Sequence, residues 1–191
     1  VPKRTLLDLF EESLAKFSEK TFLLEKRDGE FRPTSYSKTK VLAQQFGAGL
    51  CSLGYSKGEN ASILAEGCNM WIIGELAIFY AGGINVPLSV KLEESSDLSF
   101  RLIHADVVLL MVTERQLPKI RAIKDKLPML RHIIVFDPEG ELQIGELSSE
   151  YIFEVGKKYL EDNFTSFLEI GKSLQNNDIA TITYTSGTTA D

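Results

Sequence analysis

The sequence predicts an α/β fold in layers, in which a largely parallel sheet is flanked by helices. Helix-like and strand-like segments alternate along the 191 residues, which is the order that builds a parallel sheet. The run at 107–112 is continuously apolar, as expected of a strand that is buried on both faces. Hydrophobic residues make up 43% of the chain and charged residues 25%, a balance typical of a folded domain.

The individual elements follow from local patterns, in chain order. Apolar residues at helical spacing predict helices at 5–17, 36–53, 69–80, 93–104 and 147–160. Alternating or continuous apolar runs predict strands at 21–25, 30–32, 61–65, 84–88, 107–112, 132–136 and 178–185. The first two strands are expected to form a hairpin across Asp28-Gly29. No internal repeat interrupts this order.

Several element ends carry their own signals. Thr34 or Ser35 is expected to cap the helix at 36–53, and Gly54 stands where a left-handed residue ends it. Near residue 117 two starts stay open. Either Thr113 and Gln116 form a capping box, or the helix begins at Leu117 with Pro118 in its first turn. In the helix at 93–104 we expect Leu98, Leu102 and Phe100 to face inward.

Charge and cysteine content exclude several classes of protein. The formal net charge of −6 argues against a nucleic-acid partner, because such proteins present a basic surface to phosphate. Cys51 and Cys68 have no second pair and no histidine nearby, so we expect reduced thiols and no metal site. The apolar stretch at 70–81 is too short to cross a bilayer, and no signal peptide is visible. We expect a cytoplasmic protein, with peripheral membrane contact and oligomeric state left open.

Other candidate residues have structural readings. Gly47-Ala48-Gly49 follows no strand and lacks a third glycine, so it indicates helix packing and not a dinucleotide site. His104 and His132 have no nucleophile elbow near them, and we expect no catalytic role for either. Glu75, within an apolar helix, is expected to face solvent or to pair with an arginine.

The chemistry-bearing segment is the last one. The predicted strand runs into Thr185-Ser186-Gly187-Thr188-Thr189, five small residues of which four carry hydroxyls. Backbone N–H groups in such a turn form an anion-binding concavity, and the hydroxyls add donors. An ordinary polar turn is the alternative.

The order of residues in Tyr184-Thr185-Ser186-Gly187-Thr188-Thr189 resembles the signature loop of the adenylate-forming superfamily. Ala190 stands where that loop has glycine, and the Pro-Lys-Gly that follows in the family is absent from the sequence. The segments 57–64, 71–88 and 179–182 are also similar to the family's, so the resemblance covers roughly 5–191. Bacterial long-chain fatty acid–CoA ligases look most similar, on the segment 133–160 with Gly156 inside a helix.

The resemblance implies an N-terminal portion, 1–191, of the AMP-binding domain, which ends at the phosphate-binding loop. It implies ATP, Mg²⁺ and CoA as cofactors and co-substrates and a fatty acid as substrate. Thr185, Ser186, Gly187, Thr188 and Thr189 would hold the ATP phosphates, and the catalytic residues would lie beyond Asp191. The fragment alone is expected to be inactive. The alternatives are a ligase or adenylation domain for another carboxylic acid, and a stand-alone nucleotide-binding module.

Overall fold

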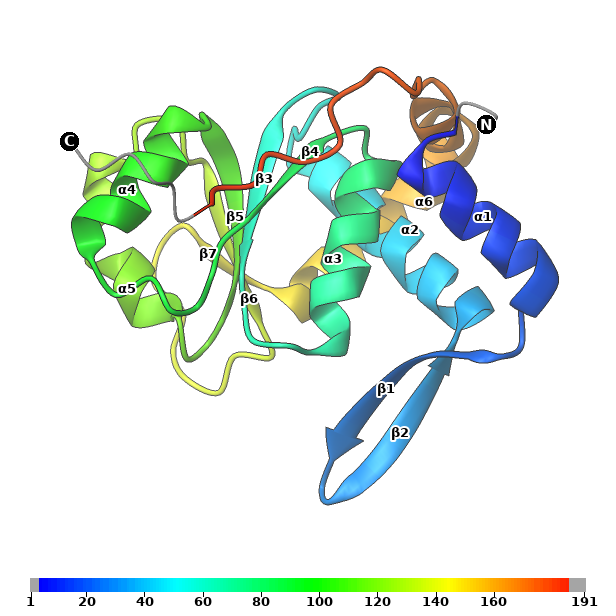
Figure 1. Cartoon of the computed structure of the whole chain (residues 1–191), viewed down its shortest axis with the longest axis horizontal. Coiled ribbons are helices and arrows are strands. Elements are labelled where there is room, and N and C mark those ends of the chain that lie inside the picture. Colours follow the sequence, from blue (N-terminus) through cyan, green and yellow to red (C-terminus); the bar gives the residue numbers. More distant parts are fainter. Residues whose placement is uncertain (1–3, 186–191) are drawn as a thin grey trace.

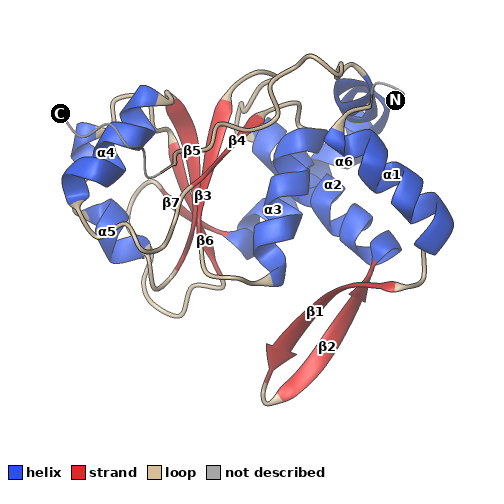
Figure 2. Ribbon diagram, in the orientation of Figure 1, coloured by secondary structure: helices blue, strands red, loops and turns tan. Residues whose placement is uncertain are grey.

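The computed structural model describes residues 4–185 and confirms the α/β fold. A five-stranded sheet in the order β4-β3-β5-β6-β7 is parallel throughout, and helices cover both of its faces (Figures 1 and 2). The elements are α1 (Leu6–Phe17), β1 (Thr21–Arg27), β2 (Glu30–Ser35), α2 (Tyr36–Ser52), β3 (Asn60–Leu64), α3 (Asn69–Tyr80), β4 (Ile84–Pro87), α4 (Ser95–His104), β5 (Val107–Thr113), α5 (Leu117–Arg121), the 3₁₀ turn η1 (Lys124–Lys126), β6 (His132–Phe136), β7 (Glu146–Ser148) and α6 (Ser149–Lys172).

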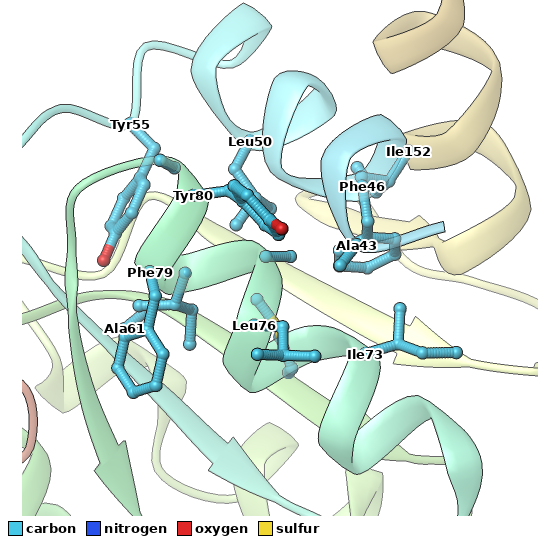
Figure 3. Close-up of a cluster of buried hydrophobic side chains, with 14 of the residues drawn as sticks. Ala43, Phe46, Leu50, Tyr55, Ala61, Ile73, Leu76, Phe79, Tyr80 and Ile152 are labelled. Carbon is cyan, nitrogen blue, oxygen red and sulfur yellow. The ribbon is translucent and has the colours of Figure 1, made fainter. Parts of the chain in front are cut away.

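The sheet separates two hydrophobic layers, because successive side chains of a strand point to opposite faces. In β5, Leu109 and Met111 join the layer with α1, α2, α3 and α6, whereas Leu110 and Val112 join the layer with α4 and α5. Every residue from Val107 to Val112 is buried, as the continuous apolar run predicts. The layer with α1, α2, α3 and α6 is called the first hydrophobic layer. Figure 3 shows the part of it where side chains of α2 and α3 meet.

Glycines let α2 approach its neighbours closely, as expected for Gly47-Ala48-Gly49. A Cβ on Gly47 would lie 2.7 Å from the carbonyl oxygen of Ala77 in α3, and one on Gly49 would lie 2.3 Å from that of Ile152 in α6. Real Cβ atoms do not approach so near. These glycines are therefore packing residues between three helices, and the dinucleotide reading is not needed.

The N-terminal elements dock on this layer. Thr5 caps α1 in a capping box with Asp8, and β1 and β2 form the predicted antiparallel hairpin, which projects away from the body (Figure 1). The hydroxyl of Tyr80 in α3 donates to a carboxylate oxygen of Glu11 in α1 at 2.5 Å, and Lys40 of α2 lies 2.7 Å from the other. The two contacts fasten α1 to α2 and α3.

Several expected ends are confirmed and others are wrong. Ser35 caps α2, Gly54 has φ of +83°, and the second start near residue 117 is the correct one, with Pro118 in the first turn of α5. Thr113 and Gln116 do not form a capping box, because both side chains bind Glu66. Phe100 does not face inward, since it is 60% exposed.

The predicted helix at 147–160 is displaced. Leu147 belongs to β7, where it pairs with Ile134 of β6, and Ser148 caps a longer helix, α6, that runs to Lys172. Both differences depend on tertiary contacts. The short strand β7 forms because β6 offers it hydrogen bonds. The second half of α6 is held by Phe167, which is buried in the first hydrophobic layer. None of the helices within 4–185 has the length and apolar character to span a membrane.

Candidate functional site

The segment 178–185, which leads to the predicted phosphate loop, lies along the edge of the sheet beside β4 (Figure 1, red trace). It is not the full strand expected. One parallel bridge joins Thr181 to Asn85, and two backbone hydrogen bonds flank it, from Asn85 N–H to Ala180 oxygen at 3.0 Å and from Ile182 N–H to Asn85 oxygen at 2.9 Å. β4 has only four residues, so it offers few backbone groups to a partner.

The alternation predicted for this segment is present. Ala180, Ile182 and Tyr184 are half-buried, while Thr181, Thr183 and Thr185 are exposed. Thr185 is thus an exposed residue at the end of an extended segment, as a loop donor would be. Ser186, Gly187, Thr188 and Thr189 lie outside the described residues.

Thr185 lies at the end of the sheet that is formed by the carboxyl ends of the strands. The segment runs parallel to β4, and β4, β3, β5 and β6 run parallel to one another. In open α/β sheets, ligands bind beside the carboxyl ends of the strands. Thr185 is the last residue that the structure describes.

Asn85 at the sheet edge has an unexpected partner. Its side chain is fully buried, and its Nδ2 donates to Oε1 of Glu75 in α3 at 2.8 Å. The expectation that Glu75 faces solvent or pairs with an arginine is therefore wrong. The carboxylate holds the side chain of the residue whose backbone pairs with Ala180 and Ile182.

A second polar cluster lies at the carboxyl ends of β3 and β5. The carboxylate of Glu66 accepts hydrogen bonds from the Thr113 hydroxyl and, at 2.6 Å, from the Gln116 amide. Burial acts to raise the pKa of Glu66, but these hydrogen bonds outweigh it and leave the pKa below its usual value. The carboxylate is thus ionised at neutral pH, and its polar partners already satisfy it.

A cavity of about 230 Å³ opens beside Tyr184 at the carboxyl end of β4. Its lining residues are Pro87, Leu88, Ser89, Lys91, Leu92, Arg101 and Tyr184. Two of these are cationic, Lys91 and Arg101, and Nη1 of Arg101 lies 4.0 Å from the carboxylate of Asp97 in the same helix. No sequence pattern indicates this cavity, because Arg101 and Tyr184 lie far apart in the chain.

The two histidines differ in their surroundings. Nδ1 of His104 lies 2.8 Å from the hydroxyl of Tyr184, so this residue borders the candidate site. Burial and the neighbouring charge of Arg131 lower the pKa of His132, which begins β6.

A larger hollow of about 690 Å³ lies between the hairpin, α2 and α6. Its charged side chains have both signs, and Arg27 within it pairs with Glu25 at 2.5 Å and with Asp137 at 3.3 Å. The charges therefore largely neutralise one another, and the hollow is a weaker candidate than the edge beside β4.

The chain is similar in sequence to known proteins. A family model described as AMP-binding enzyme matches residues 10–191. The chain is 26% identical to the long-chain-fatty-acid–CoA ligase ACSBG1 of Homo sapiens over 98% of its length, which is 26% of that protein. It is also 26% identical to the long-chain-fatty-acid–CoA ligase of Thermus thermophilus over 76% of its length, or 27% of that protein.

Solved structures share the fold. A long-chain-fatty-acid–CoA ligase from Archaeoglobus fulgidus aligns with a TM-score of 0.75 at 20% identity, over 98% of this chain and 35% of the other. The anthranilate CoA ligase AuaEII, solved with anthranoyl-AMP, aligns with a TM-score of 0.73 at 24% identity, over all of this chain and 34% of the other. The chain spans about a quarter of the length of the curated relatives it matches.

Proposed function

The chain belongs to the family of AMP-binding enzymes, and on this premise we propose that residues 1–191 are the N-terminal portion of the AMP-binding domain of an AMP-forming acid–thiol ligase. The single observation that carries the proposal is that the model of this family matches residues 10–191 of the chain. The position of Thr185, exposed at the carboxyl edge of the parallel sheet, supports it.

The proposed reaction has two steps. A carboxylate oxygen of the acid attacks the α-phosphorus of ATP, the bond to the bridging oxygen breaks, and pyrophosphate leaves. The thiol sulfur of CoA then attacks the acyl carbon, AMP leaves on its phosphate oxygen, and the thiol proton passes to a base. Stabilising the charge that develops on phosphate oxygens is the larger part of such catalysis.

The role of this chain is to bind and orient the ATP phosphates. Thr185, Ser186, Gly187, Thr188 and Thr189 provide the donors for the β- and γ-phosphates, which leave as pyrophosphate. Gly187 allows close approach of the backbone. The family's catalytic residues are expected in the part of such an enzyme that this chain does not span.

Mg²⁺ and CoA are also proposed, as metal ion and co-substrate of the complete enzyme. Mg²⁺ would neutralise phosphate charge when bound. Residues 4–185 contain no group of three or more His, Cys, Asp or Glu side chains that could hold a metal ion, so we assign no ligand for it in this part of the chain.

A long-chain fatty acid is the proposed substrate, because the relatives over most of this chain carry that name. Gly156, which first pointed to this subgroup, lies at a helix contact with Gln45 and says nothing of the acid. The similar structures include an anthranilate CoA ligase. A ligase for another carboxylic acid is therefore the second candidate.

The test is acid-dependent exchange of ATP with labelled pyrophosphate, using the complete protein that carries this chain and acids of graded length. We expect exchange to rise with long-chain acids and to fall at least a hundred-fold when Thr188 and Thr189 become Ala. Thr183→Ala, in the same segment and exposed, is the matched control and should keep full exchange. The 191-residue chain by itself is expected to be inactive.

Exchange with aromatic or short acids only would replace the fatty acid by the second candidate. No exchange with any acid, from a folded complete protein, would overturn the ligase proposal and leave the nucleotide-binding module.

A further inference from the structure

Tyr184, the residue before Thr185, is attached through its side chain to α4. Its hydroxyl lies 2.8 Å from Nδ1 of His104 and donates to the main-chain oxygen of Arg101 at 3.2 Å. The guanidinium carbon of Arg101 lies 5.8 Å from the centre of the Tyr184 ring, within the range of a cation–π contact. One side chain thus joins two residues of a helix that precedes it by about 80 positions.

The hydrogen bonds have a defined direction. A tyrosine hydroxyl has a single proton, which here goes to the carbonyl of Arg101, so His104 donates its Nδ1–H to the Tyr184 oxygen. Burial raises the pKa of Tyr184 against the opposing charge of Arg101, and the hydroxyl therefore keeps its proton. The carbonyl of Arg101 also accepts from the N–H of Ala105 at 3.1 Å, so Tyr184 uses the second lone pair of this oxygen.

The backbone holds this part of the chain only weakly. The last hydrogen bond between the segment and β4 is the one from Ile182 N–H. Among residues 4–185, the backbone groups of Thr183, Tyr184 and Thr185 make no further backbone hydrogen bond. The Tyr184 side chain is therefore the contact that continues to hold the segment as it approaches Thr185.

We propose that Tyr184, held by His104 and Arg101 of α4, is a positioning residue for the phosphate loop at 185–189. The inference rests on the proposed role of that loop. The proposed action of Tyr184 is through the backbone of the segment and needs no contact with the nucleotide. It sets where the extended segment ends, and hence where the loop's donors lie relative to the phosphates.

The test compares variants of the complete protein that differ by single atoms or donors. Tyr184→Phe removes the hydroxyl and keeps the ring, and His104→Leu removes the donor. His104→Asn keeps an N–H at about the place of Nδ1 and is the conservative variant. We measure the affinity for a fluorescent ATP analogue, the KM for ATP and kcat in pyrophosphate exchange, and the thermal midpoint.

The expected result is specific to the nucleotide. His104→Leu should weaken binding of the analogue and raise KM for ATP about five-fold, the loss expected for one neutral hydrogen bond, with kcat and KM for the acid little changed. Tyr184→Phe, which also loses the bond to the Arg101 oxygen, should weaken binding at least as much. His104→Asn should match the wild type within about two-fold. The double variant Tyr184→Phe/His104→Leu should be no worse than Tyr184→Phe, because Tyr184→Phe already removes the contact with His104.

Ser99→Ala is the matched control on α4, since the Ser99 hydroxyl bonds only within its own helix, to the oxygen of Ser96. The inference is overturned if Tyr184→Phe and His104→Leu bind the analogue as the wild type does. It is also overturned if His104→Asn is as impaired as His104→Leu, or if the single effects multiply in the double variant. Analogue binding with the expected pattern, but no exchange with any acid, supports the inference and sinks the ligase proposal instead.

Discussion

Gly156 of α6 lies against Gln45 of α2 so closely that a Cβ on Gly156 would stand 1.8 Å from the carbonyl oxygen of Gln45. The same Cβ would lie 2.8 Å from the backbone nitrogen of Gly49. Both obstacles are main-chain atoms of a helix and cannot rotate away. The α2–α6 contact, on which the first hydrophobic layer closes, therefore depends on the missing side chain at residue 156.

We predict that Gly156→Ala destabilises the protein by about 3 kcal/mol or more, since overpacking forces a shift of whole helices. Urea-induced unfolding measures the loss. Gly67→Ala is the matched control, because a Cβ on Gly67 would meet nothing within 4 Å, and its effect should stay within about 0.5 kcal/mol. Equal stability of the two variants would contradict the close contact.

Glu146 of β7 forms the most buried ion pair that the described residues show. Its side chain has no exposed area, and it accepts from Nε and Nη2 of Arg121 at 2.8 and 2.7 Å. The hydrogen bonds from Arg121 lower the pKa of Glu146. A carboxyl group whose pKa is lower in the folded than in the unfolded state stabilises the folded state at pH values above its unfolded pKa, which is about 4.3 for Glu. This stability is lost as the pH falls through the folded pKa.

Glu146→Gln should therefore cost about 2 kcal/mol at pH 7, and the difference from the wild type should shrink as the pH falls below the unfolded pKa of about 4.3. Unfolding in urea across this range is the measurement. Glu141→Gln, an exposed carboxylate nearby, is the control and should show little effect at any pH. A pH-independent deficit would show that the charge of Glu146 is not what stabilises β7.

Asn85 and Glu75 form a pair that a charge can break. Asn85→Asp would place two carboxylates in contact at a buried position, where like charges cannot both ionise at low cost. We expect a loss of about 3 kcal/mol at pH 7. The folded pair binds a proton that the unfolded chain releases, so stability should fall as the pH rises and recover in mild acid.

Glu75→Gln in the Asn85→Asp background tests the cause, because the glutamine amide can donate to the new carboxylate. The double variant should regain most of the stability at pH 7 and lose the acid recovery. Thermal midpoints of the single and double variants at pH 5 and pH 8 give both answers. A double variant as unstable as Asn85→Asp would contradict the pairing.

Tyr80 anchors α1 through Glu11. Burial raises the pKa of the Tyr80 hydroxyl, and its hydrogen bond to Glu11 adds to this, so it remains a donor. Tyr80→Phe should cost about 1.5 kcal/mol and speed amide hydrogen exchange in α1 more than in α6. Tyr151→Phe, whose ring is 43% exposed, is the control and should leave α1 unchanged.

The sequence by itself determined most of the elements and the family. Helical spacing located α1, α2 and α3, and the apolar run located β5, because burial of one or both faces leaves a local period in the chain. The residues around Thr185 pointed to the family that the comparison then matched over 10–191. Those features depend on neighbours within a few residues of one another.

Only the tertiary structure decided which distant residues meet. The local pattern places Leu147 in a helix, but in the fold it pairs with β6 as part of β7. The local pattern predicts a full strand at 178–185, but the short β4 limits its pairing to one bridge. The contacts of Tyr184 with His104 and of Asn85 with Glu75 have no sequence signal of their own. They arise because the order of strands in the sheet brings these side chains together, and that order is a property of the whole fold.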